Sequence, residues 1–390
     1  MKQNLKLMYL ISFLQGLVFY GPVSLIYRTQ RGLSISEFFF LEFILLFIIV
    51  LTEIPWGYFA DKYGYKKTLT ISYVVFFLAR FSLLFCNTFI GFLFQTILTA
   101  IGVSGTSGCD IAFLYKSCNS EESEKVFGRY RAFNSLAFFI SSITSFFFIN
   151  ISIESAIVAT VVACGLSIIT ICFTKDVEIE ISNNKNESII KDSFKNIKNV
   201  KLMFIFVIST AIISEISYGI SVNLGQLHFE SIGVDIRFLG YITALSELLA
   251  MLSFKTHVIS KKFGQVKTLK TMVSMMLLCV LVLVFTGNIF ISIIAVCSLS
   301  GLISMISPIV LDIKNKSISK NRATILSVYS MIGSLFSAFI NIVIGFCADI
   351  YLKYAFLACF IIMTIGVLGV YLYMKKDRIY KKNVEDLGKI

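Results

Sequence analysis

The feature that most constrains this chain is a succession of long apolar runs extending from one end to the other. Each run is about 20 residues long, which is the length an α-helix needs to cross the ~30 Å hydrocarbon core of a bilayer. Twelve such runs are present, at roughly 7–27, 36–57, 68–87, 90–115, 126–150, 152–173, 201–224, 237–259, 271–288, 289–313, 323–349 and 352–374.

The composition supports helices that cross a membrane. The chain is 57% hydrophobic and only 15% charged, which is more apolar surface than a soluble domain buries. The strands of a membrane barrel are shorter than these runs and alternate in polarity. The sequence therefore predicts an all-α integral membrane protein with twelve transmembrane helices.

The net charge of +12 is distributed unevenly between the two sides of these helices. If the N-terminus is inside, most lysines and arginines lie in the inner loops, and the outer side carries only Arg28, Arg31, Arg237 and Lys353. By the positive-inside rule, both termini are expected in the cytoplasm of a bacterial cell. Because the charge follows the topology, it does not indicate nucleic-acid binding.

One long polar segment divides the runs into six and six. We expect residues 1–173 and 201–374 to form two six-helix bundles joined by a cytoplasmic linker at 174–200, with a cytoplasmic tail at 375–390. Within the linker, residues 188–200 place apolar side chains near one helical face, which predicts a short amphipathic helix on the inner membrane surface. A solvated linker is the alternative.

A short polar loop occurs twice, about half a chain apart. Residues 57–69 read GYFADKYGYKKTL, and residues 261–269 read KKFGQVKTL. When the two are aligned on Gly64 and Gly264, Lys62, Lys67, Thr68 and Leu69 recur. A polar loop repeated between apolar runs predicts two related membrane halves.

The residues of the first loop suit a conformational latch. We expect Gly64 to form a tight turn and Gly57 to let helix backbones approach, while the Asp61 carboxylate faces the positive end of a neighbouring helix. Either Lys62 or Lys66 is placed to bridge Asp61 to Asp110, near the inner end of the fourth run. The alternative is a plain topological anchor of lysines.

Two carboxyl groups lie near the middle of the predicted membrane. Glu215 and Glu247 are in the seventh and eighth runs, with no basic residue at that depth in the second half. A charge there is costly, so such groups suit the uptake and release of a proton, or contact with a cationic substrate. Tyr218 and Asn223 accompany Glu215 on the same helix. The alternative is a protonated carboxyl that is hydrogen-bonded within the bundle.

Other polar groups within the runs have structural or cavity roles. Glu42 and Arg80 lie at about the same depth, ~10 Å from the outer ends of adjacent helices, and are expected to form a structural ion pair. A second set is expected to line a cavity or to form interhelical hydrogen bonds: Gln15, Tyr20, Asn134 and Asn341.

The sequence gives no sign of a metal site, a cofactor or an enzyme. Its nine cysteines lack paired spacing, and His228 and His257 are the only histidines, so a zinc site is not expected. There is no phosphate-binding Gly-x-x-x-x-Gly-Lys-Ser/Thr motif. No nucleophile or metal constellation marks a membrane enzyme.

These motifs resemble a known family. The 57–69 loop resembles the signature between the second and third helices of the major facilitator superfamily, and the stretches at 53–57 and 107–115 resemble bacterial members. Arg322 and the residues after it resemble the start of the family's eleventh helix, and the resemblance implies that this helix is the neighbour of Asp61. The fifth run lacks the proline that many exporters carry, and Lys116 replaces an acid.

The resemblance, which covers essentially the whole chain, implies a secondary transporter that works by alternating access between two bundles. We expect a monomeric, drug-efflux-like permease that exports an amphipathic or cationic small molecule, such as an antibiotic, in exchange for protons. The alternative is a proton-linked uptake symporter or a facilitator for a small metabolite. A more distant alternative is a membrane sensor that does not transport.

Overall fold

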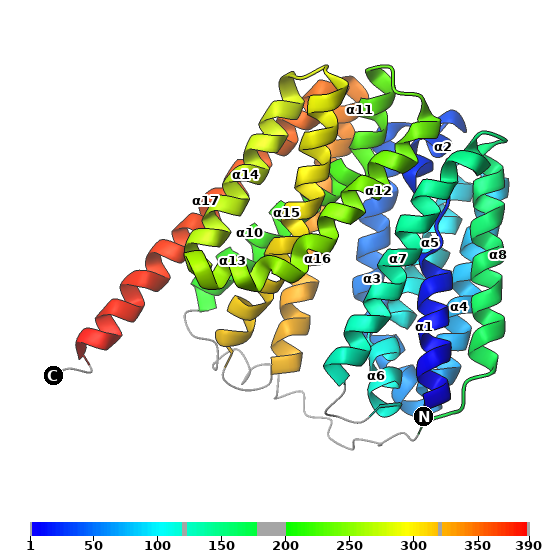
Figure 1. The fold of residues 1–390 in the computed structure, drawn as a ribbon, viewed down its shortest axis with the longest axis horizontal. Coiled ribbons are helices and arrows are strands. Elements are labelled where there is room, and N and C mark those ends of the chain that lie inside the picture. Colours follow the sequence, from blue (N-terminus) through cyan, green and yellow to red (C-terminus); the bar gives the residue numbers. More distant parts are fainter. Residues whose placement is uncertain (1, 119–122, 178–199, 319–321, 388–390) are drawn as a thin grey trace. The chain divides into compact units, whose positions relative to one another are not determined.

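The computed structural model describes residues 2–118, 123–177, 200–318 and 322–387, and the regular structure in these residues is helical (Figure 1). Twelve segments of the described chain are long and apolar enough to cross a membrane: Gln3–Gln30, Ile35–Tyr63, Tyr65–Phe85, Phe89–Lys116, Lys125–Ile149, Ile153–Cys172, Lys201–Ser231, Ile236–Ser253, Gln265–Phe285, Ile289–Lys316, Ile325–Ile350 and Leu352–Lys376. The predicted twelve-helix, all-α fold is confirmed. The side on which the termini lie stays a prediction.

The contacts divide the chain into two compact units. Unit 1 comprises Met1–Asn184 and Gln226–Glu247, and unit 2 comprises Lys185–Gly225 and Leu248–Ile390. The predicted linker at 174–200, with its amphipathic helix, lies largely outside the described residues, so the boundary between two bundles stays a prediction.

Most helices of unit 1 come from the first half of the sequence: α1 (Lys2–Gly16), η1 (Gly21–Val23), α2 (Ser24–Gln30), α3 (Ile35–Tyr63), α4 (Tyr65–Ser82), η2 (Leu83–Phe85), α5 (Phe89–Thr106), α6 (Cys109–Lys116), α7 (Ser123–Ile149) and α8 (Ile153–Cys172). Unit 1 also holds η5 (Ile236–Phe238) and most of α11 (Gly225–Ser231) and α12 (Leu239–Ala250).

Unit 2 contains the remaining helices: α10 (Val200–Tyr218), the π-helical η4 (Gly219–Leu224), η6 (Met251–Lys255), α13 (Thr256–Phe263), α14 (Gln265–Phe285), α15 (Ile289–Lys316), α16 (Arg322–Ile350) and α17 (Leu352–Leu387). Within it, α10 packs against α16 and α17, and α14 packs against α15 and α17.

The first membrane segment is broken, unlike the continuous run in the sequence. Helix α1 ends at Gly16 and regular structure resumes at Gly21. The backbone N–H groups of Val18 and Phe19 donate instead to Ser141 Oγ (3.2 Å) and Thr160 Oγ1 (3.0 Å). Because unpaired backbone groups are costly within a bilayer, these hydroxyls make the break tolerable.

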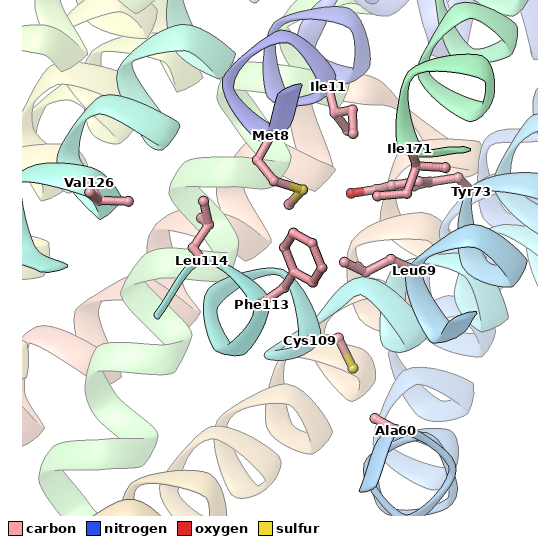
Figure 2. Packing of buried hydrophobic residues seen from close by; sticks show 10 residues of the cluster. All are labelled: Met8, Ile11, Ala60, Leu69, Tyr73, Cys109, Phe113, Leu114, Val126 and Ile171. Carbon is pink, nitrogen blue, oxygen red and sulfur yellow. The ribbon is translucent and has the colours of Figure 1, made fainter. Parts of the chain in front are cut away.

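One end of unit 1 is held together by a buried apolar cluster around Phe113 (Figure 2). The cluster joins α1, α3, α4, α6, α7 and α8 through Met8, Ile11, Ala60, Leu69, Tyr73, Cys109, Phe113, Leu114, Val126 and Ile171. Ala60 and Leu69 are the residues on either side of the loop between α3 and α4. The cluster therefore fixes both ends of that loop.

Candidate functional site

The two copies of the repeated loop have the same backbone geometry. Gly64 separates α3 from α4 with φ 96° and ψ 151°, and Gly264 separates α13 from α14 with φ 83° and ψ 139°. The hydroxyl and the N–H of Thr68 both bond Gly64 O, at 2.8 and 3.1 Å. Thr268 bonds Gly264 O in the same way, at 2.9 and 3.0 Å. The predicted tight turn at Gly64 is confirmed, and the repeat extends to individual hydrogen bonds.

The acid next to the first loop lies beside a tyrosine. Asp110 lies in the first turn of α6, where its Oδ1 accepts a 2.7 Å hydrogen bond from the N–H of Ile111. The Tyr130 side chain, from α7, lies close enough to Asp110 and to Tyr73 of α4 to interact with both. Asp61 is close enough to Cys109 for its charge to act there. The two predicted acids therefore lie at the same end of unit 1.

The lysine bridge expected between these acids is not formed in this structure. Lys66 Nζ donates to the carbonyl oxygens of Cys172 (3.3 Å) and Thr174 (2.5 Å), so it caps the end of α8. Lys62 Nζ lies 5.1 Å from the centre of the Tyr63 ring. A cation near a helix C-terminus is favourable because it faces the negative end of the helix dipole, which explains why Lys66 binds there.

The expected close approach at Gly57 is not seen within the described residues of unit 1, where a Cβ added there would meet nothing within 4 Å. Arg322 begins α16 in unit 2, so its meeting with Asp61 stays a prediction. The same holds for the opening and closing of a latch.

The second loop has an acidic partner that our sequence analysis missed. Gln265 Nε2 donates to Asp312 Oδ2 of α15 at 2.6 Å, and Lys316 Nζ lies 2.6 Å from the same oxygen. Asp312 lies 202 residues after Asp110, close to the spacing of 200 between the loops. That offset is the signal that would have found it.

Glu215 is the predicted midplane carboxyl with the best-defined surroundings. Asn341 Nδ2, from α16, donates to Glu215 Oε1 at 2.8 Å, and Ser337 from the same helix lies close to this carboxyl. Both Asn341 and Ser337 are buried. The π-helical η4 begins four residues after Glu215, and π-helical turns frequently occur at functional sites. Asn341, predicted as a cavity residue, is therefore a direct partner of Glu215.

The other residues predicted with Glu215 are not the donor or acceptor of this hydrogen bond. Asn223 is buried within η4, and Tyr218, the last residue of α10, is half exposed. Glu247 is the last residue of unit 1 and has no hydrogen-bond partner in the described part of the chain. Contact of these residues with a substrate stays a prediction.

Arg80 lies among aromatic rings inside unit 1. Its guanidinium carbon is 4.7 Å from the centre of the Phe76 ring and 5.3 Å from that of Tyr20, which is buried. Its Nη1 atom is buried without a hydrogen-bond partner among the described residues. An ion pair between Arg80 and Glu42 stays a prediction.

Gln15 and Asn134 connect helices of unit 1. Gln15 Nε2 donates to Ser167 Oγ at 2.5 Å, and Asn134 Nδ2 donates to Ser12 O at 3.1 Å. These bonds join α1 to α8 and to α7, which fits the interhelical alternative. A cavity role for either residue stays a prediction.

A second residue absent from our sequence analysis holds the broken first segment. Gln226 Oε1 accepts from the Leu25 N–H at 2.9 Å, and its Nε2 donates to Gly21 O (3.2 Å) and Ser24 Oγ (3.3 Å). Gln226 is buried. No local signal marks it, because its partners lie about two hundred residues earlier in the chain.

No metal-binding cluster of His, Cys, Asp and Glu occurs in the residues that the structure describes. The described residues combine twelve helices long and apolar enough to span a membrane, a repeated loop of nearly identical geometry, and a partly buried carboxyl bound by an amide, which define a polytopic membrane protein.

A family model gives this class a name. The model of the Major Facilitator Superfamily matches residues 7–339, so the chain belongs to this superfamily, which is a class of transporters and not of enzymes. No curated protein matches the chain.

Solved structures of this fold include the nucleoside transporter NupG, with a TM-score of 0.77 at 15% identity, covering 95% of this chain and 98% of that chain. The structure of the D-xylose-proton symporter matches with a TM-score of 0.72 at 12% identity, covering 95% of this chain and 97% of that chain. The structure of the POT family transporter PepTSo matches with a TM-score of 0.77 at 12% identity, covering 97% of this chain and 98% of that chain. At such identities, these likenesses show the fold alone.

Proposed function

We propose that this protein is a proton-coupled secondary transporter of a small organic solute, with Glu215 as the group that takes up and releases the proton. The hydrogen bond between Glu215 and Asn341 carries the proposal. It joins α10 to α16 next to the π-helical η4, so a change in the protonation of Glu215 alters a contact between two spans. A carboxyl within a membrane span is costly, and this cost favours a functional role for Glu215.

The solute and the direction of transport belong to the same proposal. A carboxyl in an apolar bundle suits an amphipathic or cationic solute, and export of such a compound remains our first expectation. Uptake of a small metabolite is the second candidate, favoured by the absence of the exporter proline from the fifth span. Similar folds serve proteins named for nucleosides and for xylose, so the fold does not choose the solute. A bacterial cell membrane and a monomeric state also stay proposals.

Proton flux in inside-out vesicles tests the coupling. A pH-sensitive dye reports proton movement when a panel of lipophilic cations, antibiotics, nucleosides and sugars is added to the wild type. Glu215→Gln should abolish solute-triggered proton flux but retain counterflow, because exchange without a gradient needs no net proton transfer. Glu230→Gln is the matched control, since Glu230 is an exposed acid of the same span.

Each outcome has a distinct meaning. Loss of flux in Glu215→Gln alone supports coupling through this carboxyl, and the sign of the flux gives the direction. Unchanged driven transport in Glu215→Gln would overturn the role of Glu215. Loss of flux only in Glu247→Gln would move that role to Glu247.

A further inference from the structure

Unit 2 carries a groove on its surface. It has a volume of about 560 Å³ and lies between α14 and α17, which pack against each other. Its lining combines two lysines, three hydroxyl groups and three apolar side chains: Val266, Lys267, Lys270, Thr271, Ser274, Met275, Leu278 and Tyr371.

The groove has a basic end and an apolar end. Lys267 and Lys270 lie in the first two turns of α14, and Leu278 lies roughly 12–16 Å further along the helix axis. Met275 and Leu278 are 50% and 59% exposed on the outside of the unit. In a membrane protein, such an apolar surface faces acyl chains, while lysines at a helix end lie at the headgroup level.

Three of the polar residues of the groove form one connected arrangement. Ser274 Oγ and the Tyr371 hydroxyl are 2.9 Å apart, and Lys270 Nζ lies 4.8 Å from the centre of the Tyr371 ring. This contact holds the Lys270 side chain beside two hydroxyl groups. An ammonium with hydroxyls next to it is a suitable set of donors for a phosphate oxygen.

The positive charge of this end has no acidic counterpart in the lining. Lys267 and Lys270 lie near the N-terminus of α14, where cations oppose the helix dipole. The nearby carboxylate of Asp312 is engaged by Gln265 and Lys316. An anion from outside the chain would complement this charge.

We propose that this groove binds an anionic phospholipid, with the phosphate at Lys267, Lys270, Ser274 and Tyr371 and an acyl chain along Met275 and Leu278. Basic pockets between transmembrane helices are suited to anionic headgroups. A free phosphate would use only the basic end and leave the exposed apolar half without a partner. The occupant is therefore a lipid of the surrounding bilayer.

Lipid binding to the purified full-length protein tests this proposal. Dioleoyl phosphatidylglycerol and dioleoyl phosphatidylcholine, which have the same chains, are titrated separately, and bound lipid is counted by native mass spectrometry. We expect phosphatidylglycerol to bind at least about tenfold more tightly than phosphatidylcholine. The double variant Lys267→Ala/Lys270→Ala should weaken it about twenty- to thirtyfold, because each lysine near an anionic headgroup contributes roughly a factor of five.

Lys261→Ala/Lys262→Ala is the matched control, since it removes the same charge from neighbouring α13 without touching the groove. Retention of phosphatidylglycerol binding in this control supports a specific site. Equal weakening in both double variants would reduce the effect to general surface charge and overturn the proposal.

Two further measurements keep the test decisive if the groove variant does not fold. Glycerol 3-phosphate should fail to displace phosphatidylglycerol from the wild type. Equal binding of glycerol 3-phosphate would show a site for soluble phosphate and overturn the lipid proposal. Lys267→Arg/Lys270→Arg should retain lipid binding, and its loss in that folded variant would contradict recognition by charge.

Discussion

At the scale of single residues, the two loop glycines are the positions where the chain most requires one residue type. Gly64 and Gly264 combine a positive φ with a ψ near 150°, a region essentially restricted to glycine. Gly57 belongs to the same signature, but lies inside α3 with open space around it. The backbone explains the first two glycines and leaves Gly57 without a packing role in this structure.

Gly64→Ala should lower the free energy of unfolding by about 1–3 kcal/mol, which is the usual cost of forcing a side chain into this backbone region. Gly264→Ala should behave in the same way, because its geometry is nearly identical. Gly57→Ala is the control and should leave stability unchanged or raise it by about 1 kcal/mol, since alanine favours a helix over glycine. Thermal unfolding in detergent measures all three, and an equal loss in Gly57→Ala would contradict this account.

The pH dependence of transport should also separate two acids. The hydrogen bonds from Arg237 lower the pKa of Asp235 to about 2 from 3.8. The stabilisation of the fold by the Asp235–Arg237 pair is therefore fully present above pH 3.8 and is lost only as the pH falls towards about 2. Asp235→Asn should leave the shape of the pH profile unchanged between about pH 5 and 8, whereas Glu215→Gln should flatten it. A changed profile in Asp235→Asn would contradict this assignment.

At the scale of elements, the broken first segment depends on polar side chains from elsewhere in unit 1. Ser141, Thr160 and Gln226 satisfy backbone groups at and beyond the break. The break comes before Pro22, because α1 already ends at Gly16 and Pro22 lies in η1. An added Cβ at Gly16 would lie 2.5 Å from Asn134 O, so α1 and α7 approach closely where the helix stops.

Gln226→Leu should destabilise the segment around Leu25, because the buried N–H loses its acceptor at a cost of about 1–3 kcal/mol. Hydrogen–deuterium exchange should rise over residues 17–30 and stay unchanged in α8. Gln226→Glu keeps an oxygen for the Leu25 N–H and should restore part of the protection. Unchanged hydrogen–deuterium exchange in Gln226→Leu would show that the hydrogen bonds of Gln226 contribute nothing to the order of this segment.

At the scale of the whole molecule, the repeat predicts a common side of the membrane for both loops. In a variant lacking the nine native cysteines, Lys62→Cys and Lys262→Cys should both react with an impermeant thiol reagent in inside-out vesicles. Lys353→Cys should react only in right-side-out vesicles, because it lies at the opposite end of a predicted span. Labelling of the two loop cysteines from different sides would overturn the repeated topology.

Prediction from sequence succeeded where a physical limit acts on a stretch of chain. The thickness of the bilayer fixes the length of a spanning helix, so the twelve spans were predictable. The turns at Gly64 and Gly264 were predictable because few residues other than glycine adopt their geometry. Prediction from sequence failed for Lys66, because its partners at the end of α8 lie more than one hundred residues away.

The sequence by itself determined that this chain is a twelve-helix membrane protein with a repeated loop, because hydrophobic length and repeated motifs are local properties. Only the tertiary structure decided that Glu215 meets Asn341, that Gln226 holds the broken first segment, and that two lysines share a groove with Tyr371. These contacts join residues that are about 100 to 200 positions apart. Which residue fills such a position depends on how helices pack, and packing is not encoded in any single stretch of the chain.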